Sequence, residues 1–299
     1  MMVGGAWSGR GLGHVIRIKP DISDRKLLRL FHLGARISWT SEDYPEFLPS
    51  GVEPRAALAL AHLMTPVYLG EQSAMLGANR AIAYFSEHRD MSYVVYLSTF
   101  MVDEARHLEA ITRLYDGLQT DPLAIRDLPD MLRYHHRMRA GQEIATWVFG
   151  IMVSDLFAKH FYRALAVLYK DAPLGHMAVR VIQDESRHQA FAEHYLRANL
   201  PTLSDDRYTE LWDLKEDLLR IIGNMARSLG DDARALGISA PELFDRFATD
   251  VSEHSRRMGL KARCRRCPLE GGPPPDWSQL AGEGGCACEA FSRTVAREG

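Results

Sequence analysis

The sequence predicts an all-α protein, a four-helix bundle with additional C-terminal helices and a short cysteine-bearing tail. Long stretches repeat apolar residues with the helical period, and no convincing alternation of apolar and polar residues marks a strand. The motif Asp-Glu-x-Arg-His occurs twice, at 103–107 and 184–188, which indicates two related halves. With 299 residues, 46% of them hydrophobic, the chain is long and apolar enough to form one large core.

Four long helices are expected to form two antiparallel hairpins. The predicted ranges are 54–88 and 91–118 in the first hairpin, and 141–169 and 176–199 in the second. Pro54 suits a first helical turn, where its missing N–H costs nothing. Residues 119–140 contain two prolines and are predicted to be a crossover with one short helix. Two hairpins joined by a long connection form a standard four-helix bundle. Further helices are expected at 24–33, 204–229 and 241–260.

Composition divides the chain into three parts and excludes several classes of function. We expect an N-terminal arm and connector at 1–50, a helical domain at 51–260 and a cysteine-containing tail at 261–299.

A net charge of −3, without a dense basic run, argues against nucleic acid as a partner. We expect no membrane span, because uncharged apolar stretches are too short, and no secretory signal in the glycine-rich start. These features predict a cytoplasmic protein.

The two Glu-x-x-His pairs are the strongest candidate metal ligands. Glu104 and His107, like Glu185 and His188, lie three residues apart on one helix face, so both side chains can reach one metal ion. Their faces are apolar, which predicts that both pairs point into the core, where unpaired carboxylates would be costly. One such pair is usually a surface ion pair, but two inward-facing copies predict a dinuclear metal site.

Each partner helix should add one carboxylate. Glu71 shares its helix face with apolar residues and is the candidate on the first helix, although it could instead pair with an arginine. The third helix offers Asp155 and Glu143. Asp155 lies at the depth of the other candidates, whereas Glu143 would lie about 20 Å too far along the bundle axis at 1.5 Å per residue. We therefore predict Asp155 as the sixth ligand.

The acids that precede the pairs, Asp103 and Asp184, are candidates to accept the outer N–H of a ligating imidazole. Arg106 and Arg187 could anchor these acids. The alternative for these four residues is a solvated helix face.

The set of Glu71, Glu104-x-x-His107, Asp155 and Glu185-x-x-His188 resembles the ferritin-like, carboxylate-bridged di-iron proteins. This superfamily includes bacterial multicomponent monooxygenases, ribonucleotide reductase small subunits, acyl-carrier-protein desaturases and aryl-coenzyme A ring epoxidases. The aspartate in the third helix looks most like the epoxidases. Ile111 occupies the position of the reductase radical tyrosine, which weakens a reductase assignment.

The resemblance implies an O₂-dependent di-iron oxygenase that hydroxylates, epoxidises or N-oxygenates a small organic or carrier-bound substrate. Two iron ions are expected, with a manganese–iron pair as the variant, together with an external electron donor. The alternatives are a desaturase-type or ligand-binding di-metal oxidase and a non-enzymatic iron-storage or metal-sensing bundle. A homodimer is a plausible assembly.

The tail contains the only cysteines of the sequence, Cys264, Cys267, Cys286 and Cys288. Four closely paired thiolates are typical of a structural zinc site or a small iron–sulfur centre. The alternative is an unstructured tail with free thiols, and the sequence leaves both open.

Overall fold

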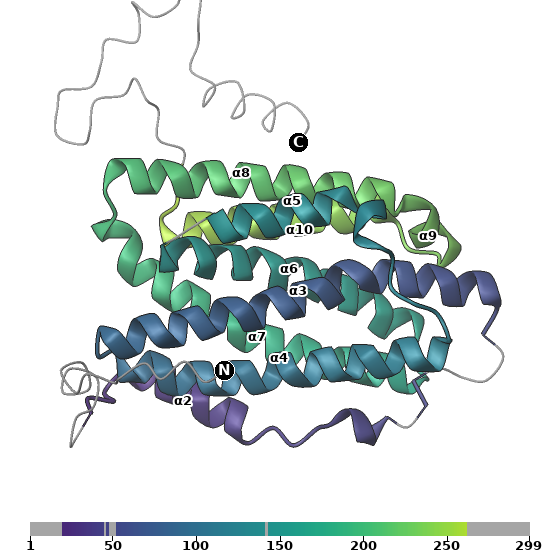
Figure 1. Ribbon diagram of the computed structural model, residues 1–299, viewed down its shortest axis with the longest axis horizontal. Helices are drawn as coiled ribbons and strands as arrows, with labels where there is room; N and C mark the ends of the chain where they lie inside the picture. The colour runs from purple at the N-terminus through teal and green to yellow at the C-terminus, as the bar shows by residue number, and fades with distance from the viewer. Residues whose placement is uncertain (1–19, 45, 48–51, 141–142, 262–299) are drawn as a thin grey trace, which may run out of the picture.

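The computed structural model describes residues 20–261 except 45, 48–51 and 141–142 (Figure 1). Those residues form helices and short 3₁₀ turns with no strand, as the sequence predicts. The 3₁₀ turns are Ser41–Asp43, Ile125–Asp127 and Leu200–Thr202. The α-helices are α2 (Arg25–Ala35), α3 (Pro54–Glu87), α4 (Met91–Leu118), α5 (Pro129–Ala140), α6 (Ile144–Leu168), α7 (Pro173–Asn199), α8 (Asp205–Ser228), α9 (Gly230–Ala235) and α10 (Ala240–Met258).

The hairpins α3–α4 and α6–α7 form the predicted four-helix bundle (Figure 1). Glu53 caps α3, because its carboxylate accepts a hydrogen bond from the Ala56 N–H at 3.0 Å, and Pro54 occupies the first turn. The first hairpin turns at Arg89, whose backbone is left-handed with φ 67°. The second turns just before Gly175, where a Cβ would overlap the Tyr169 carbonyl, so this close approach requires glycine.

The third and fourth helices differ from their predicted ranges at their N-terminal ends. The third begins at Ile144 instead of residue 141, and Glu143 takes the N-cap position. The fourth begins at Pro173 instead of residue 176, because proline fits the first turn of a helix. The crossover contains α5, which is 12 residues long. The six-residue helix α9 lies between the two predicted C-terminal helices and was not predicted.

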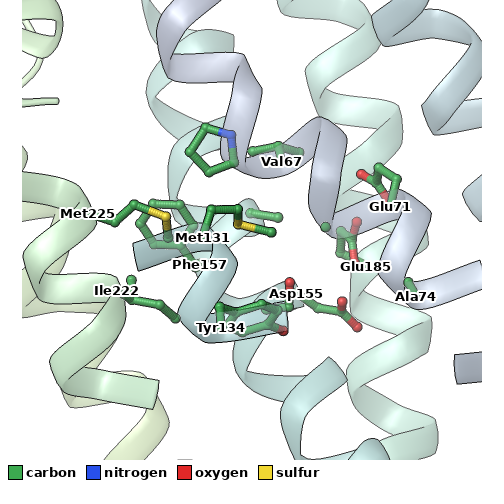
Figure 2. Close-up of a pocket in the computed structure, with 14 residues that line it drawn as sticks. Val67, Glu71, Ala74, Met131, Tyr134, Asp155, Phe157, Glu185, Ile222 and Met225 are labelled. Atoms are coloured by element: carbon green, nitrogen blue, oxygen red, sulfur yellow. The ribbon is translucent and has the colours of Figure 1, made fainter. Parts of the chain in front are cut away.

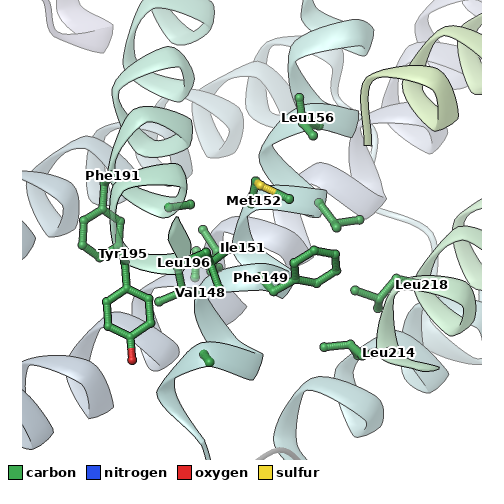
Figure 3. Close-up of a cluster of buried hydrophobic side chains, with 14 of the residues drawn as sticks. Val148, Phe149, Ile151, Met152, Leu156, Phe191, Tyr195, Leu196, Leu214 and Leu218 are labelled. Carbon is green, nitrogen blue, oxygen red and sulfur yellow. The ribbon is translucent and has the colours of Figure 1, made fainter. Parts of the chain in front are cut away.

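Helices α5, α8 and α10 cover one side of the bundle, and α2 packs against α4 and α7 on the other (Figure 1). Figure 3 shows how α8 is attached: Leu214 and Leu218 of α8 face Phe149 of α6 within a buried apolar cluster. On the opposite side of α6, Val148 and Ile151 meet α7. Further helices therefore cover the four-helix bundle on both sides.

Helix α6 is the one described helix that is long and apolar enough to cross a membrane. Of its most apolar window, 67% is buried inside the bundle. Its composition is thus explained by its place in the core.

Candidate metal centre

Six buried side chains from the four long helices meet in the centre of the bundle as two groups of three. Glu71 of α3 joins Glu104 and His107 of α4, and Asp155 of α6 joins Glu185 and His188 of α7. In each group, one potential ligand atom from each residue lies within 4.8 Å of the others. These are the six residues that the sequence singled out, and the structure brings all of them together.

The two groups adjoin each other through the glutamates of the Glu-x-x-His pairs. Glu185 Oε1 lies 3.6 Å from His107 Nδ1, and Glu185 Oε2 lies 3.4 Å from His188 Nδ1. Glu104 Oε1 lies 3.1 Å from His188 Nδ1, although Glu104 belongs to the group of His107. Both glutamates therefore lie at the boundary of the two groups and would help to hold metal in either one.

Each imidazole is held by an aspartate from the other hairpin. His107 Nε2 lies 3.2 Å from Asp184 Oδ2, and His188 Nε2 lies 3.3 Å from Asp103 Oδ2. A carboxylate only accepts, so Nε2 donates in both rings and Nδ1 is the nitrogen that faces the buried carboxylates. Arg187 donates hydrogen bonds to both aspartates at 2.7 Å. The sequence analysis named Arg187 as one of two arginines that could anchor them.

Five buried atoms in this centre have no hydrogen-bond partner in the described part of the chain: Glu104 Oε2, His107 Nδ1, Asp155 Oδ2, Glu185 Oε2 and His188 Nδ1. They are lone-pair donors that face one another, an arrangement that costs free energy unless a cation lies between them. The six side chains thus fit a di-metal centre, and their mix of carboxylate oxygens and imidazole nitrogens matches ferritin-like di-iron and di-manganese proteins.

The protonation of the centre reflects crowding of acids in the core. Burial and the neighbouring Glu71 charge raise the pKa of Glu104 well above its ordinary value. Burial and the charge of Glu185 do the same to the pKa of Asp155. Burial also disfavours ionised Asp103 and Asp184, but hydrogen bonds from His188 and His107 and the Arg187 charge outweigh it, so the pKa of each aspartate is lowered. The outer aspartates are therefore the permanent anions.

Glu143, the alternative to Asp155, lies elsewhere. It is exposed at the N-cap of α6 and pairs with Arg207 at 3.3 Å. Glu71 contacts His107 at 3.6 Å and is not paired with an arginine in the described residues. The four cysteines of the tail lie outside the described residues, so their metal site stays a prediction.

Two residues near the centre were not predicted. Trp39, from the segment assigned to the N-terminal arm, donates from Nε1 to Asp184 Oδ2 at 3.0 Å, and its ring stacks on His107 with centroids 6.0 Å apart. Tyr162 of α6 is fully buried, its hydroxyl has no hydrogen-bond partner in the described chain, and burial together with Glu71 raises its pKa. No local pattern marks either residue, because only the folded bundle brings Trp39 to Asp184 and buries Tyr162 near the centre.

A partly open pocket reaches the centre from the side covered by α5 and α8. Figure 2 shows Glu71, Asp155 and Glu185 at its inner end, and Met131, Phe157, Ile222 and Met225 along its outer part. Its free volume of about 30 Å³ is room for one or two water-sized molecules. The pocket gives the centre a mostly apolar approach.

Comparison with known proteins identifies the fold. No protein-family model matches the sequence. A solved R2-like ligand-binding oxidase with an aerobically reconstituted Mn/Fe cofactor is similar to this chain with a TM-score of 0.66 and 18% identity, over 81% of this chain and 96% of that one. The oxidase after photoconversion gives a TM-score of 0.67 at 18% identity, over 81% and 95%. These matches do not single out the aryl-coenzyme A epoxidases that Asp155 suggested. The chain has the ferritin-like fold of the R2-like ligand-binding oxidases.

Proposed function

We propose that this protein is an O₂-dependent di-metal oxidoreductase of the monooxygenase type. Its metal ligands would be Glu71, Glu104, His107, Asp155, Glu185 and His188. The main support for this proposal lies in the bundle core. Five carboxylate oxygens and imidazole nitrogens converge there, and none has a hydrogen-bond partner in the described part of the chain. A buried cluster of this kind would be costly for a purely structural bundle, and a pair of cations removes that cost.

The donor set favours iron, with a manganese–iron pair as the variant. Hard carboxylate oxygens suit iron and manganese, imidazole suits iron, and no thiolate is present among the six residues. The similar oxidase carries a Mn/Fe cofactor, which supports the manganese–iron variant here. When bound, two such metals supply the electron pair that reduces O₂.

The protein residues keep the centre in a reactive geometry. Asp103 and Asp184 fix the tautomer and orientation of the two imidazoles, and Arg187 holds these aspartates in place. Glu104 and Asp155, with raised pKa values, can hold protons before metal binding and release them on ligation. Val67, Phe157 and Ile222 keep the approach apolar, which limits water near the metals.

The pocket indicates the class of substrate. Apart from the ligands themselves, its polar side chains are Tyr134 and Ser154, and burial raises the pKa of Tyr134 to about 12, so its hydroxyl stays protonated. We propose a compact, mostly apolar organic substrate or the end of a carrier-bound one, which enters between α5 and α8. A monooxygenase also needs an external electron donor, and we propose that the protein and this donor are both cytoplasmic.

A ligand-binding oxidase is the second candidate, because the similar solved structures carry that name. It would reduce O₂ without transferring an oxygen atom to a released product. An iron-storage bundle would instead load far more iron than two ions per chain.

The test loads the metal-free protein with Fe(II) without oxygen and then adds ¹⁸O₂, a reductant and a panel of small apolar compounds. The proposal predicts about two irons per chain, O₂ uptake and ¹⁸O in a product. O₂ uptake without label in any product would favour the ligand-binding oxidase. No O₂ uptake at all, with two irons bound, would contradict both.

A further inference from the structure

A second pocket adjoins the first, and every side chain that lines it is apolar. It lies where α3, α6, α8, α9 and the start of α10 meet. Phe161 of α6, Leu229, Ala233 of α9 and Leu243 of α10 form its walls. The pocket is partly open, but a water molecule inside it would find no polar side chain to bind, and apolar sites accept apolar atoms such as xenon.

Three residues line both pockets: Pro66 of α3, Phe157 of α6 and Met225 of α8. Phe157 follows Asp155 by two residues, so this shared wall lies beside the metal-centre pocket. Figure 2 shows Met225 and Phe157 together at the end of that pocket away from Glu71 and Glu185. Methionine has three rotatable bonds and readily changes its shape. Movement of Met225 can therefore join the two pockets.

Size narrows the choice of occupant. The free volume is about 30 Å³, the same as that of the first pocket, and suits one or two molecules the size of water. A small apolar molecule fits both the size and the lining. Among the reactants of the proposed function, only O₂ is small and uncharged and lacks strong hydrogen-bonding groups.

We propose that this second pocket binds O₂ and delivers it to the metal centre past Met225. The delivery of O₂ rests on the O₂-dependent function proposed above. The binding of an apolar gas in this pocket does not depend on that function. O₂ then enters the first pocket through the shared wall, whereas an organic substrate enters it between α5 and α8.

Xenon under pressure is the probe for the site, with crystals of the full chain. We expect a xenon peak in contact with Phe161, Leu229 and Ala233. Ala233→Leu should fill the pocket and remove the peak. Ala248→Leu is the matched control, because Ala248 is a half-buried residue of α10 that does not line the pocket, and it should leave the peak unchanged. If Ala233→Leu fails to fold, Leu243→Phe fills the pocket from the opposite wall.

The delivery step is tested by reoxidation of the reduced, metal-loaded protein at several O₂ concentrations, with no substrate present. Ala233→Leu should lower the second-order rate constant by about tenfold, and Ala248→Leu should leave it unchanged. An unchanged rate in Ala233→Leu, the absence of xenon in the parent protein, or an alkyl chain bound in the pocket would overturn the proposal. If the parent protein binds xenon but never reacts with O₂, the proposed function fails while the gas site stands.

Discussion

Asp103 on α4 accepts its hydrogen bond from His188 on α7, the imidazole of the opposite hairpin, at 3.3 Å. Asp184 and His107 repeat the arrangement in the reverse direction at 3.2 Å. Each Asp-Glu-x-Arg-His segment therefore presents a glutamate and a histidine to the centre and an aspartate to the histidine of the other segment. This exchange couples the two hairpins, and it fixes which imidazole nitrogen faces the carboxylates.

Loss of either outer aspartate should weaken metal binding without unfolding the protein. We expect Asp103→Asn and Asp184→Asn each to lower metal affinity by about 10–100-fold, because the amide no longer fixes the tautomer of the imidazole. Asp250→Asn is the matched control, since Asp250 bonds His160 at 2.9 Å away from the centre. Titration with Fe(II) under nitrogen measures the affinities. Equal affinity in all three variants would show that the exchanged aspartates do not support the ligands.

The two histidines should be needed for metal occupancy. We expect His107→Ala and His188→Ala to lose most bound metal while the helical content measured by circular dichroism survives, because the surrounding core is apolar and extensive. His160→Ala, which changes a histidine outside the centre, should keep full occupancy. The assignment is wrong if both His107→Ala and His188→Ala retain all their metal.

Asp155 in the middle of α6 and Glu143 at its N-cap should behave differently. Asp155→Ala should abolish O₂ reactivity, because it removes a carboxylate of the buried group. Glu143→Ala should leave metal content and O₂ reactivity near those of the parent, because its side chain is exposed and pairs only with Arg207 in the described chain. O₂ uptake after metal loading distinguishes the two variants. The reverse pattern would place the third-helix ligand at Glu143.

Metal binding should strengthen as the pH rises. Burial raises the pKa of Glu104 and Asp155, and nearby carboxylates such as Glu71 outweigh burial and raise the pKa of His107. In the metal-free protein these groups therefore keep protons at pH values where they would ordinarily be lost, and a metal must displace them. Calorimetry in buffers of different ionisation enthalpy should show proton release on Fe(II) binding. Affinity that is independent of pH, with no proton release, would contradict this protonation scheme.

Gly77 should be intolerant of a side chain. A Cβ at this position in α3 would overlap the indole of Trp147 on α6, so Gly77→Ala should destabilise the protein by about 1–3 kcal/mol. Gly117→Ala is the control, because nothing lies within 4 Å of a Cβ there, and it should stabilise α4 by about 0.5–1 kcal/mol. Urea unfolding of the metal-free protein measures both. Equal stability of the two variants would show that Trp147 does not pack on Gly77.

The sequence was sufficient to predict the four-helix bundle and the meeting of the six central residues inside it. Helical periodicity reports which side of each helix is buried, and the rise per residue reports depth, so Asp155 could be chosen over Glu143. Trp39 could not be found in this way, because its bond to Asp184 joins distant parts of the chain. Likewise, Met225 and Ala233 line pockets only because α8 and α9 fold back on α3 and α6.

We propose that the two groups of three residues hold one metal ion each. Anomalous scattering from crystals of the iron-loaded protein, recorded on both sides of the iron absorption edge, locates these ions. We expect two adjacent peaks, one bounded by Glu71, Glu104 and His107 and the other by Asp155, Glu185 and His188. Iron peaks only at other places in the chain, or no peak between these carboxylates and imidazoles in fully loaded protein, would contradict it.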